Sequence, residues 1–353
     1  MLKRKTRWEI HKQDQQVVDT LVEALKISPT LARLLINRGF TTVEAAQDFI
    51  NMEKKELYDP LLLDGMEAAV ERIRHAIQAD ENILVYGDYD ADGVTATSLM
   101  VQGLRKLGAQ VDYYVPHRFT EGYGPNIPAF EKAKQAEIDL IITVDTGIAA
   151  NDVIEAANLM NLDVIITDHH EPPAVLPDAS IIINPKKPGC PYPFKGLAGV
   201  GVAFKVIQAL MGEVPEELLD LVALGTIADL VPLVDENRLL VIKGLKRINQ
   251  SPRPGIRALL TVSDIEPGSV MADNIGFSLG PRINAAGRMD HARPAIELML
   301  ADDDQDVEQL ATLLDDYNIE RKQIVETIAE EAIAHVDTLP SDQKNVIVVA
   351  GEG

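Results

Sequence analysis

Short apolar runs alternate with amphipathic stretches through the middle of the chain. The runs at 83–87, 110–115, 139–144, 163–167 and 181–184 are rich in Val, Ile, Leu and Tyr and have the length of buried strands. Apolar residues in the stretches between them recur with the period of a helix. Strands that alternate with helices build a parallel sheet with helices on both faces, so the pattern predicts the α/β class.

Helical periodicity dominates on either side of this region. Residues 15–50 predict three short helices, with Ser28 as an N-cap and Gly39 as a stop signal. A long helix is expected from about Asp304 to His335. The final run NVIVVAGEG is typical of a first strand, so we expect a truncated fragment in which a further domain is only begun. The expected parts are an N-terminal helical segment (1–55), an α/β domain (56–235), a helical extension with a basic loop (236–303), a connector helix (304–338) and the start of a second α/β domain (339–353).

Composition indicates a folded chain with an unusual charge. Of 353 residues, 46% are hydrophobic and 25% are charged, which is ordinary globular usage. No run approaches the roughly 18 apolar residues of a membrane span, and no secretory core is present, so we expect a cytoplasmic protein without a membrane partner. The single Cys190 agrees with a reducing compartment. The net charge of −22 should repel nucleic acid, so nucleic-acid binding would need locally placed cations.

Residues capable of metal chemistry gather where the predicted strands end. In a parallel sheet these ends form one ligand-binding edge. The groups there are Asp88, Asp90 and Asp92 after the first strand, Asp145 after the third, and Asp168, His169 and His170 after the fourth, with Asp229 in an apolar helical segment expected to join them. So many carboxylates could share a small space only if cations compensated them. Oxygen ligands with one or two imidazoles suit Mn²⁺ or Mg²⁺, and a pair of such ions indicates phosphoester hydrolysis.

Individual aspartates in this group could have simpler roles than metal binding. The motif GDYDADG matches the start of an EF-hand loop, but Leu99 stands where that loop needs Glu, and a strand precedes the motif. Asp92 or Asp168 could instead cap a following helix, and Asp229 could be satisfied by a backbone or arginine partner. Capping does not explain three acids within five residues together with a histidine pair. The metal hypothesis therefore accounts for more of the pattern.

Two glycine-containing segments with loop-like composition supply candidate phosphate contacts. HRFTEGYG carries Arg118 and also Tyr123, whose ring could stack on a base. GPRINAAGR carries Arg282, Asn284 and Arg288, and guanidinium groups can hold phosphates bidentately. Each arginine could equally form an ion pair on so acidic a protein. Taken with the acidic cluster, these segments favour phosphate binding.

Six motifs resemble, in their order along the chain, those of the RecJ single-strand-specific exonucleases in the DHH phosphoesterase superfamily: GDYDADG, VDTGI, TDHHE, GLAGVGVAFK, ALGTIADLVPL and GPRINAAGR. The resemblance spans about residues 80–290 and implies a DHH domain over 56–235. It implies an enzyme with two divalent cations, Mn²⁺ preferred and Mg²⁺ as the alternative. Such an enzyme releases mononucleotides from single-stranded DNA, 5′ to 3′, in recombination and repair. Single-strand-binding protein and a RecQ-type helicase are its implied partners.

The resemblance also assigns metal ligands by motif. Asp90 and Asp92 would hold one ion each, and Asp145 would bridge both. His169 and Asp229 would complete the second site.

Other roles follow from the same motifs. Asp88 is expected just outside the ligand set, and His170 is expected against the scissile phosphate. Arg118, Arg282 and Arg288 would follow the DNA backbone.

Departures from the family pattern keep other functions open. The family continues after VVAGEG with a DHH-associated domain and an OB-fold, and we expect such parts to supply DNA-binding surface. One alternative is a phosphodiesterase of short oligoribonucleotides or cyclic dinucleotides. Its His-x-x-x-Asp-x-Asp opening would need histidine where Tyr86 stands. Another alternative is a non-catalytic DNA-binding relative, and the intact set of acids and histidines argues against it.

Overall fold

The computed structural model describes residues 9, 12–301, 304–338, 347–348 and 350. The chain divides into two compact units, Met1–Leu57 and Tyr58–Gly353. The boundary expected after residue 55 lies two residues before this division. Most of the expected second α/β domain (339–353), including most of its first strand, lies outside the described residues. No helix in the described part of the chain is long and apolar enough to cross a membrane.

The first unit contains three short helices. They are α1 (Gln15–Leu25), α2 (Pro29–Asn37) and α3 (Val43–Ile50), followed by a 3₁₀ turn at Met52–Lys54. The expected cap at Ser28 is confirmed, because its hydroxyl accepts a hydrogen bond from the backbone N–H of Leu31 at 3.2 Å. The chain then leaves α2 through Gly39, whose φ is 88°. The buried apolar cluster of these helices consists of Val18, Leu21, Ala32, Leu35 and Ala46.

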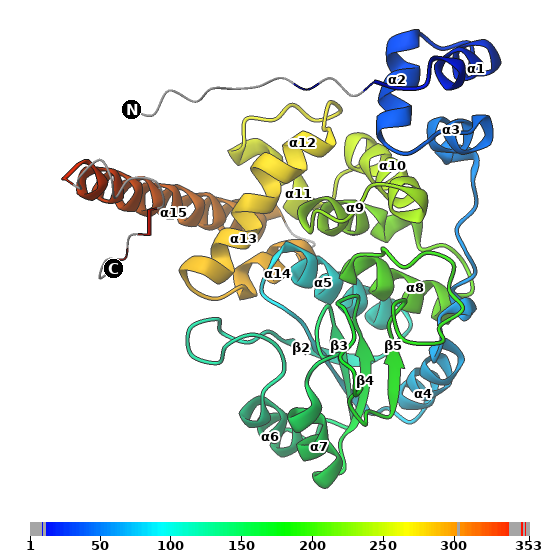
Figure 1. The fold of residues 1–353 in the computed structure, drawn as a ribbon. Helices are drawn as coiled ribbons and strands as arrows, with labels where there is room; N and C mark the ends of the chain where they lie inside the picture. Colours follow the sequence, from blue (N-terminus) through cyan, green and yellow to red (C-terminus); the bar gives the residue numbers. More distant parts are fainter. Residues whose placement is uncertain (1–8, 10–11, 302–303, 339–346, 349, 351–353) are drawn as a thin grey trace. The chain divides into compact units, whose positions relative to one another are not determined.

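The second unit is built on a five-stranded parallel sheet (Figure 1). The strands are β1 (Asn82–Tyr86), β2 (Gln110–Tyr114), β3 (Leu140–Val144), β4 (Asp163–Thr167) and β5 (Ile181–Ile183). Each strand lies within one residue of the bounds that the apolar runs predict. They pair in the order β2-β1-β3-β4-β5, so β2 and β3 flank β1 on opposite sides. The strand order therefore reverses between β1 and β3. Open parallel sheets bind ligands at such a reversal, beyond the carboxyl ends of the strands.

Helices cover both faces of this sheet, as the alternating pattern predicts. Those of one face are α6 (Ile127–Gln135) and α7 (Asn151–Leu159), and those of the other are α4 (Met66–Gln78), α5 (Ala91–Lys106) and α8 (Gly199–Met211). Phe130, Ile154 and Ile166 belong to the buried apolar cluster beneath α6 and α7. The first turn of α5 is wholly buried, which holds the residues that follow β1 in one conformation.

A helical region follows the sheet. It contains α9 (Leu219–Ala228), α10 (Asp235–Gln250), α11 (Pro254–Val262), α12 (Ala272–Asn274), a π-helical turn (Ile275–Leu279), α13 (Gly280–Met289), α14 (Arg293–Leu300) and α15 (Asp304–Thr338). α9 packs against α5 and α10, and α13 packs against α15. The long helix expected from Asp304 is present. Its first turns bury Val307, Ala311 and Leu314, whereas the side chains beyond Arg321 are mostly exposed.

The segment GPRINAAGR forms helix α13, so the expectation of a basic loop here is wrong. Its glycines lie against neighbouring elements and not in turns. A Cβ on Gly280 would lie 3.3 Å from the Cβ of Ala228, and one on Gly287 would lie 2.7 Å from the carbonyl oxygen of Tyr89. Close packing therefore selects these glycines and overrides their low helix propensity.

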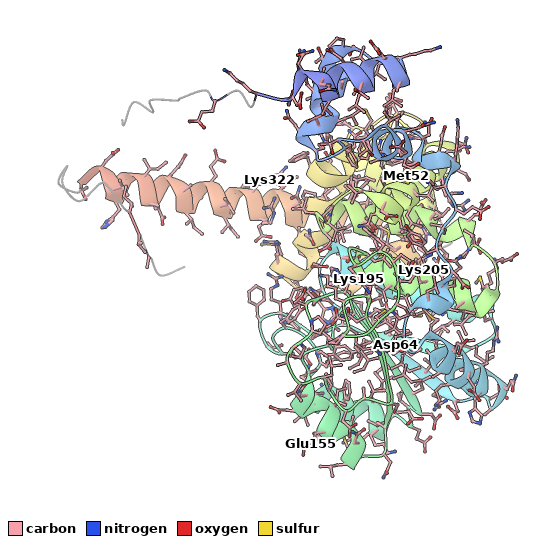
Figure 2. All side chains as sticks on the ribbon, turned by 45° about the vertical axis from the view of Figure 1, so that its right-hand side comes forward. Met52, Asp64, Glu155, Lys195, Lys205 and Lys322 are labelled. Atoms are coloured by element: carbon pink, nitrogen blue, oxygen red, sulfur yellow. The ribbon has the colours of Figure 1, made fainter. Side chains whose placement is uncertain are left out.

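A buried charged network around Lys205, which is labelled in Figure 2, ties the start of the second unit to its helices. Lys205 on α8 is fully buried, and its Nζ lies 2.5 Å from Oε1 of Glu236. The same Nζ donates to the carbonyl oxygen of Tyr58 at 2.8 Å, and the hydroxyl of Tyr192 donates to the other oxygen of Glu236. Burial lowers the pKa of Lys205, and the charge of Glu236 opposes that shift. Because each charged group has partners, the core tolerates the pair.

Candidate metal centre

The acidic residues meet at the reversal between β1 and β3. The GDYDADG motif continues β1 into α5, and Asp145 directly follows β3. Asp145 has a left-handed backbone with φ of 60°, which aspartate tolerates better than most residues. His169 follows β4, and Asp229 ends α9. Strand ends and helix ends from four parts of the sequence thus supply one site.

Backbone hydrogen bonds give two acids of the motif different positions. Oδ1 of Asp90 caps α5 by accepting from the backbone N–H groups of Asp92 and Gly93, each at 3.0 Å. The buried carboxylate of Asp92 faces the N-terminus of α8 and accepts from Gly199 at 2.6 Å and Val200 at 2.9 Å. The capping role considered for Asp92 therefore belongs to Asp90.

Two glycines let helices approach the acids closely. A Cβ on Gly199 of α8 would lie 2.3 Å from Oδ1 of Asp145. A Cβ on Gly225 of α9 would lie 2.8 Å from Oδ1 of Asp92. Any larger residue at these positions would displace the carboxylates or the helices, so both glycines are needed for this geometry.

Three overlapping groups of side chains offer ligand atoms that lie within 4.8 Å of one another. The groups are Asp88, Asp90 and Asp145; Asp92, His169 and Asp229; and Asp145, His169 and His170. Nε2 of His169 lies 3.1 Å from Oδ1 of Asp145 and 3.8 Å from Oδ2 of Asp229, which connects the groups. The sequence-predicted ligands are therefore together in space. Asp88 belongs to the first group by geometry, although the sequence places it just outside the ligand set.

Burial raises the pKa of the clustered carboxyl groups. Burial and then the charge of Asp90 raise the pKa of Asp88 to about 7 and that of Asp92 to about 7. Burial and then the charge of Asp92 raise the pKa of Asp229 to about 7 and also raise the pKa of Asp145. Burial and, to a lesser extent, mutual repulsion thus make the charged carboxylates unfavourable without a positive charge between them.

Several buried atoms at the site have no hydrogen-bond partner among the described residues. They include one oxygen each of Asp88 and Asp145 and both ring nitrogens of His169. Burial lowers the pKa of His169, which favours the neutral imidazole that binds metals. Unpartnered buried polar atoms cost free energy unless something binds them. A set of oxygen ligands with one or two imidazoles fits two divalent cations such as Mn²⁺ or Mg²⁺.

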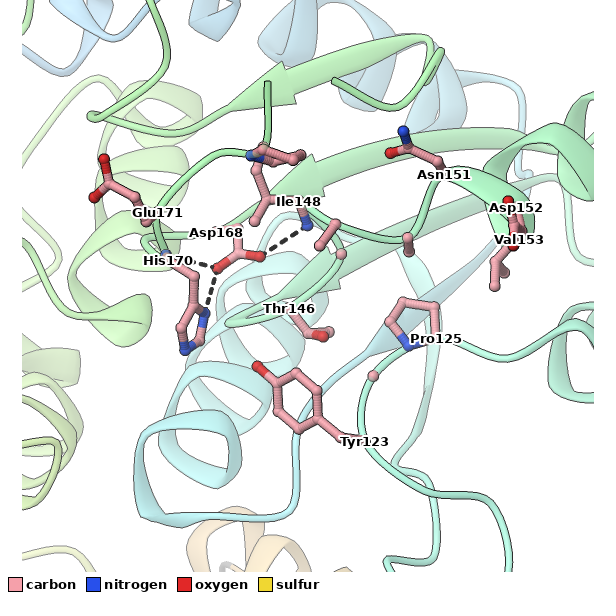
Figure 3. Close-up of a pocket in the computed structure, with 15 residues that line it drawn as sticks. Tyr123, Pro125, Thr146, Ile148, Asn151, Asp152, Val153, Asp168, His170 and Glu171 are labelled. Atoms are coloured by element: carbon pink, nitrogen blue, oxygen red, sulfur yellow. Dashed lines mark hydrogen bonds and ion pairs between the residues drawn. The ribbon is translucent and has the colours of Figure 1, made fainter. Parts of the chain in front are cut away.

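His170 is held differently from its neighbour (Figure 3). Its Nδ1 lies 2.8 Å from Oδ1 of Asp168, and Oδ2 of that carboxylate accepts from the backbone N–H of Ile148 at 2.9 Å. The hydrogen bond with Asp168 raises the pKa of His170, against the effect of burial. For Asp168, burial acts to raise the pKa, but the hydrogen bonds from His170 lower it. Asp168 therefore orients a ring that readily carries a positive charge.

An open pocket of about 540 Å³ adjoins His170 (Figure 3). Asp168, Tyr123, Pro125 and Ile148 contribute to its lining, together with the loop that enters α7. The ring of Tyr123 stands at 82° to that of His170, with 6.3 Å between the ring centres. The volume of the pocket lies within the range of sites for small organic ligands.

The candidate phosphate contacts differ in their surroundings. The guanidinium of Arg118 lies over the ring of Tyr89, 4.1 Å from its centre. Arg288 is exposed in the last turn of α13. Nε of Arg282 instead forms an ion pair with Asp315 on α15 at 2.9 Å, so the ion-pair alternative applies to this arginine.

Asn284 and Asp168 have structural partners that the sequence did not reveal. Oδ1 of Asn284 accepts from the backbone N–H of Ala91 at 2.8 Å and joins α13 to the first turn of α5. The sequence places Asp168 in the acidic cluster, with helix capping as the alternative, whereas in the structure it orients His170. The available signal was the position of this acid, directly before a histidine pair at a strand end.

Comparison with known proteins agrees with this geometry. Residues 82–226 match the model of the DHH family, N-terminal domain. The single-stranded-DNA-specific exonuclease RecJ of Bacillus subtilis is 51% identical over 348 residues, covering 99% of this chain and 44% of that protein. The chain therefore spans less than half the length of this relative.

Solved structures lead to the same family. RecJ from Thermus thermophilus in complex with Mn²⁺ aligns with a TM-score of 0.79 at 31% identity, covering 92% of this chain and 47% of that one. Exonuclease RecJ bound to manganese aligns with a TM-score of 0.73 at 35% identity, covering 79% of this chain and 72% of that one. The fold is thus that of a DHH-family protein. Within this class, the chain belongs to the RecJ family.

Proposed function

We propose that the chain is the catalytic core of a two-metal exonuclease that degrades single-stranded DNA from 5′ to 3′ and releases 5′-mononucleotides in recombination and repair. The observation that carries this proposal is the pair of ligand groups connected through Asp145 and His169. Two cations held by adjoining ligand groups can act on one phosphodiester. The relatives named above support the choice of DNA as substrate and of Mn²⁺ as the preferred cation. Mg²⁺ is the alternative.

The ligand groups divide between two cations. Asp90 and Asp145 would hold the first, with Asp88 beside them, and Asp92, His169 and Asp229 would hold the second. When bound, the cations supply polarisation of the phosphoryl group, a more acidic attacking water and neutralisation of charge on the departing oxygen. The burial of Asp88, Asp92 and Asp145 keeps their surroundings poor in water, which strengthens their electrostatic effect.

His170 is placed to bind the scissile phosphate. Since its Nδ1 is turned to Asp168, its Nε2 remains to donate to a phosphate oxygen. The raised pKa of His170 favours the protonated ring, in which Nε2 is a donor. We place the terminal nucleoside in the adjoining pocket, with Tyr123 against its base, and the backbone phosphates at Arg118 and Arg288.

Two contacts expected from the sequence are left out of this proposal. Arg282 is paired with Asp315, and the side-chain oxygen of Asn284 is bonded to Ala91, so both have structural roles.

We also propose a setting for the reaction. A cytoplasmic location fits a substrate that belongs to chromosomal DNA. Single-strand-binding protein and a RecQ-type helicase are the proposed partners, because both would act on the strand that is degraded. Co-precipitation of either protein with the chain in the presence of nuclease-resistant DNA tests this part.

Degradation of 5′-labelled single-stranded and duplex DNA in Mn²⁺ tests the activity, with Asp145→Asn as the inactive variant. We expect single strands to be degraded to mononucleotides, duplexes to persist and the variant to be inactive. A matched control is Asp139→Asn, at the opposite end of β3, which should remain active. Degradation of dinucleotides without degradation of DNA would indicate the small-substrate alternative. Mn²⁺ binding without any hydrolysis would contradict a catalytic core.

A further inference from the structure

Two large apolar side chains stand exposed near the end of α9, the helix that ends at Asp229. Leu230 is 84% exposed and Phe277 is 81% exposed. Asp229, which precedes Leu230, is also the ligand of its group that is most open to solvent, with 22% of its side chain exposed against 7% for His169 and 1% for Asp92. The second ligand group is therefore most open to solvent at Asp229, directly before Leu230 in the chain.

The backbone of Leu230 is held in an unfavourable conformation. Its φ of 63° is left-handed, which glycine adopts freely and a leucine does not. A leucine that keeps its side chain in solvent gains little from packing, so core stability does not explain the residue. Backbone strain of this kind concentrates at ligand-binding and catalytic sites.

Phe277 lies in the π-helical turn, an irregularity that is frequent at functional sites. This turn packs against the end of α9, because a Cβ on Gly276 would lie 3.9 Å from Cγ2 of Ile227 and one on Gly280 would lie 3.3 Å from the Cβ of Ala228. Phe277 is thus fixed near the end of α9 without being buried by it.

The helix that carries Phe277 continues to a proposed phosphate contact. α12, the π-helical turn and α13 follow one another without a break (Figure 1). Phe277 and Arg288 are separated on it by about three turns, or about 16 Å. A strand whose backbone is held at Arg288 can therefore bring neighbouring bases to Phe277.

We propose that Phe277 and Leu230 form an apolar ledge against which unstacked bases lie as single-stranded DNA enters the metal centre. This inference rests on the proposed nuclease function and adds a specificity determinant to it. Aromatic and apolar faces accept any base, so the ledge gives affinity without sequence preference. Base faces in a duplex are already stacked on one another, so the ledge favours single strands.

Binding of a fluorescently labelled oligothymidylate to the whole chain, with Ca²⁺ in place of Mn²⁺, tests the ledge. Phe277→Ala weakens binding about tenfold, the effect of losing one stacked base, and Phe277→Trp restores it. Leu230→Gly removes the apolar side chain and therefore weakens binding. Because glycine also relieves the backbone strain, the Tm is not lowered. Leu159→Ala removes a side chain that is 82% exposed at the far end of α7 and serves as the control with unchanged binding.

Two further measurements separate the ledge from the chemistry. In Mn²⁺, Phe277→Ala raises KM for single strands and leaves hydrolysis of bis(p-nitrophenyl) phosphate, a diester without bases, unchanged. An oligonucleotide with an abasic tract binds the wild type and Phe277→Ala equally well. Equal affinities of the wild type and both ledge variants for oligothymidylate, while the wild type still degrades single strands, overturn the ledge alone. A wild type that neither binds nor degrades DNA overturns the nuclease function and the ledge together.

Discussion

Asp145 combines several features that are unfavourable for folding. It is buried, its backbone is left-handed, and one of its oxygens has no hydrogen-bond partner in the described part of the chain. Its raised pKa reflects burial and the nearby charge of Asp92. Residues with such perturbed environments concentrate at functional sites, where binding compensates the cost. The same carboxylate joins the two ligand groups through His169, so stability and function compete at this position.

The substitution Asp145→Asn should separate these two effects. It removes a buried like charge, so the metal-free protein is expected to unfold a few degrees higher than the wild type. It also removes a proposed ligand of the first cation, which lies 3.1 Å from His169 of the second group, so stabilisation by Mn²⁺ and hydrolysis should both be lost. Thermal unfolding in chelator and in Mn²⁺ measures the first two effects. A variant that is less stable without metal would show that Asp145 has a structural partner and not a repulsive one.

The pH dependence of stability follows from three carboxyl groups. The pKa values of Asp88, Asp92 and Asp229 are about 7 in the folded chain, against an ordinary value of 3.8. The folded chain therefore binds more protons than the unfolded chain between these values, and this contribution to stability is lost as the pH rises from about 4 to about 7. Bound Mn²⁺ replaces the protons, so the gain in Tm from Mn²⁺ should grow over the same range. A gain that is independent of pH would contradict the proposed ligands.

Residue types could be predicted from the sequence better than residue roles. Acids and histidines at strand ends indicate a metal site because the chain topology brings strand ends together. The sequence alone does not show which neighbouring acid caps α5, and here Asp90 does so while Asp92 faces α8. It also does not reveal that Asp168 orients His170, because that contact depends on how the chain turns after β4.

Helices α8 and α9 position the second ligand group because glycines let them approach it. The N-terminus of α8 donates two hydrogen bonds to Asp92, and α9 ends at Asp229. These contacts link residues more than a hundred positions apart, so they require the tertiary fold. The metal centre is therefore sensitive to substitutions at positions that do not themselves supply a ligand.

Gly199→Ala should disturb the centre from within α8. Its Cβ would lie 2.3 Å from Oδ1 of Asp145, so the carboxylate or the helix must move. We expect a loss of about 1–3 kcal/mol in the free energy of unfolding and much weaker Mn²⁺ binding. Gly201→Ala is the control, since its nearest neighbour is the flexible end of Leu197 at 3.3 Å. Chemical unfolding and calorimetric titration with Mn²⁺ compare the two, and equal effects would exclude a specific role for Gly199.

Elements were predictable where local pattern and tertiary packing agree. The strands and the helices between them follow apolar periodicity, so their bounds are close to the expected ones. α13 was not predictable in this way. Gly280 and Gly287 indicate turns in the local sequence, but in the fold they allow close packing against neighbouring residues. Leu230 shows the same limit, since nothing in its local sequence predicts a left-handed backbone.

The charge of the whole molecule opposes its proposed substrate. A net charge of −22 repels DNA, so affinity must come from a few cations near the centre and from contacts with the bases. Arg118 and Arg288 are the proposed phosphate contacts, and bound divalent cations would offset part of the acidic field. Binding should therefore depend less on salt than it does for basic DNA-binding proteins.

This balance can be measured as the salt dependence of binding. Two arginine contacts to the phosphates of a single strand contribute about −1.4 to the slope of log K against log salt, and Arg288→Ala should make the slope less negative by about 0.7. Lys246→Ala, which removes an exposed cation from α10, is the control and should leave the slope unchanged. Fluorescence anisotropy at several salt concentrations gives these slopes. An unchanged slope for Arg288→Ala would remove this residue from the DNA path.

The number and position of bound cations test the central claim most directly. Crystals of the chain equilibrated with Mn²⁺ should show two peaks in an anomalous difference map recorded near the manganese absorption edge. One peak should lie among Asp88, Asp90 and Asp145, and the other among Asp92, His169 and Asp229. A single peak, or peaks away from these side chains, would contradict a two-metal centre at the end of β1 and β3.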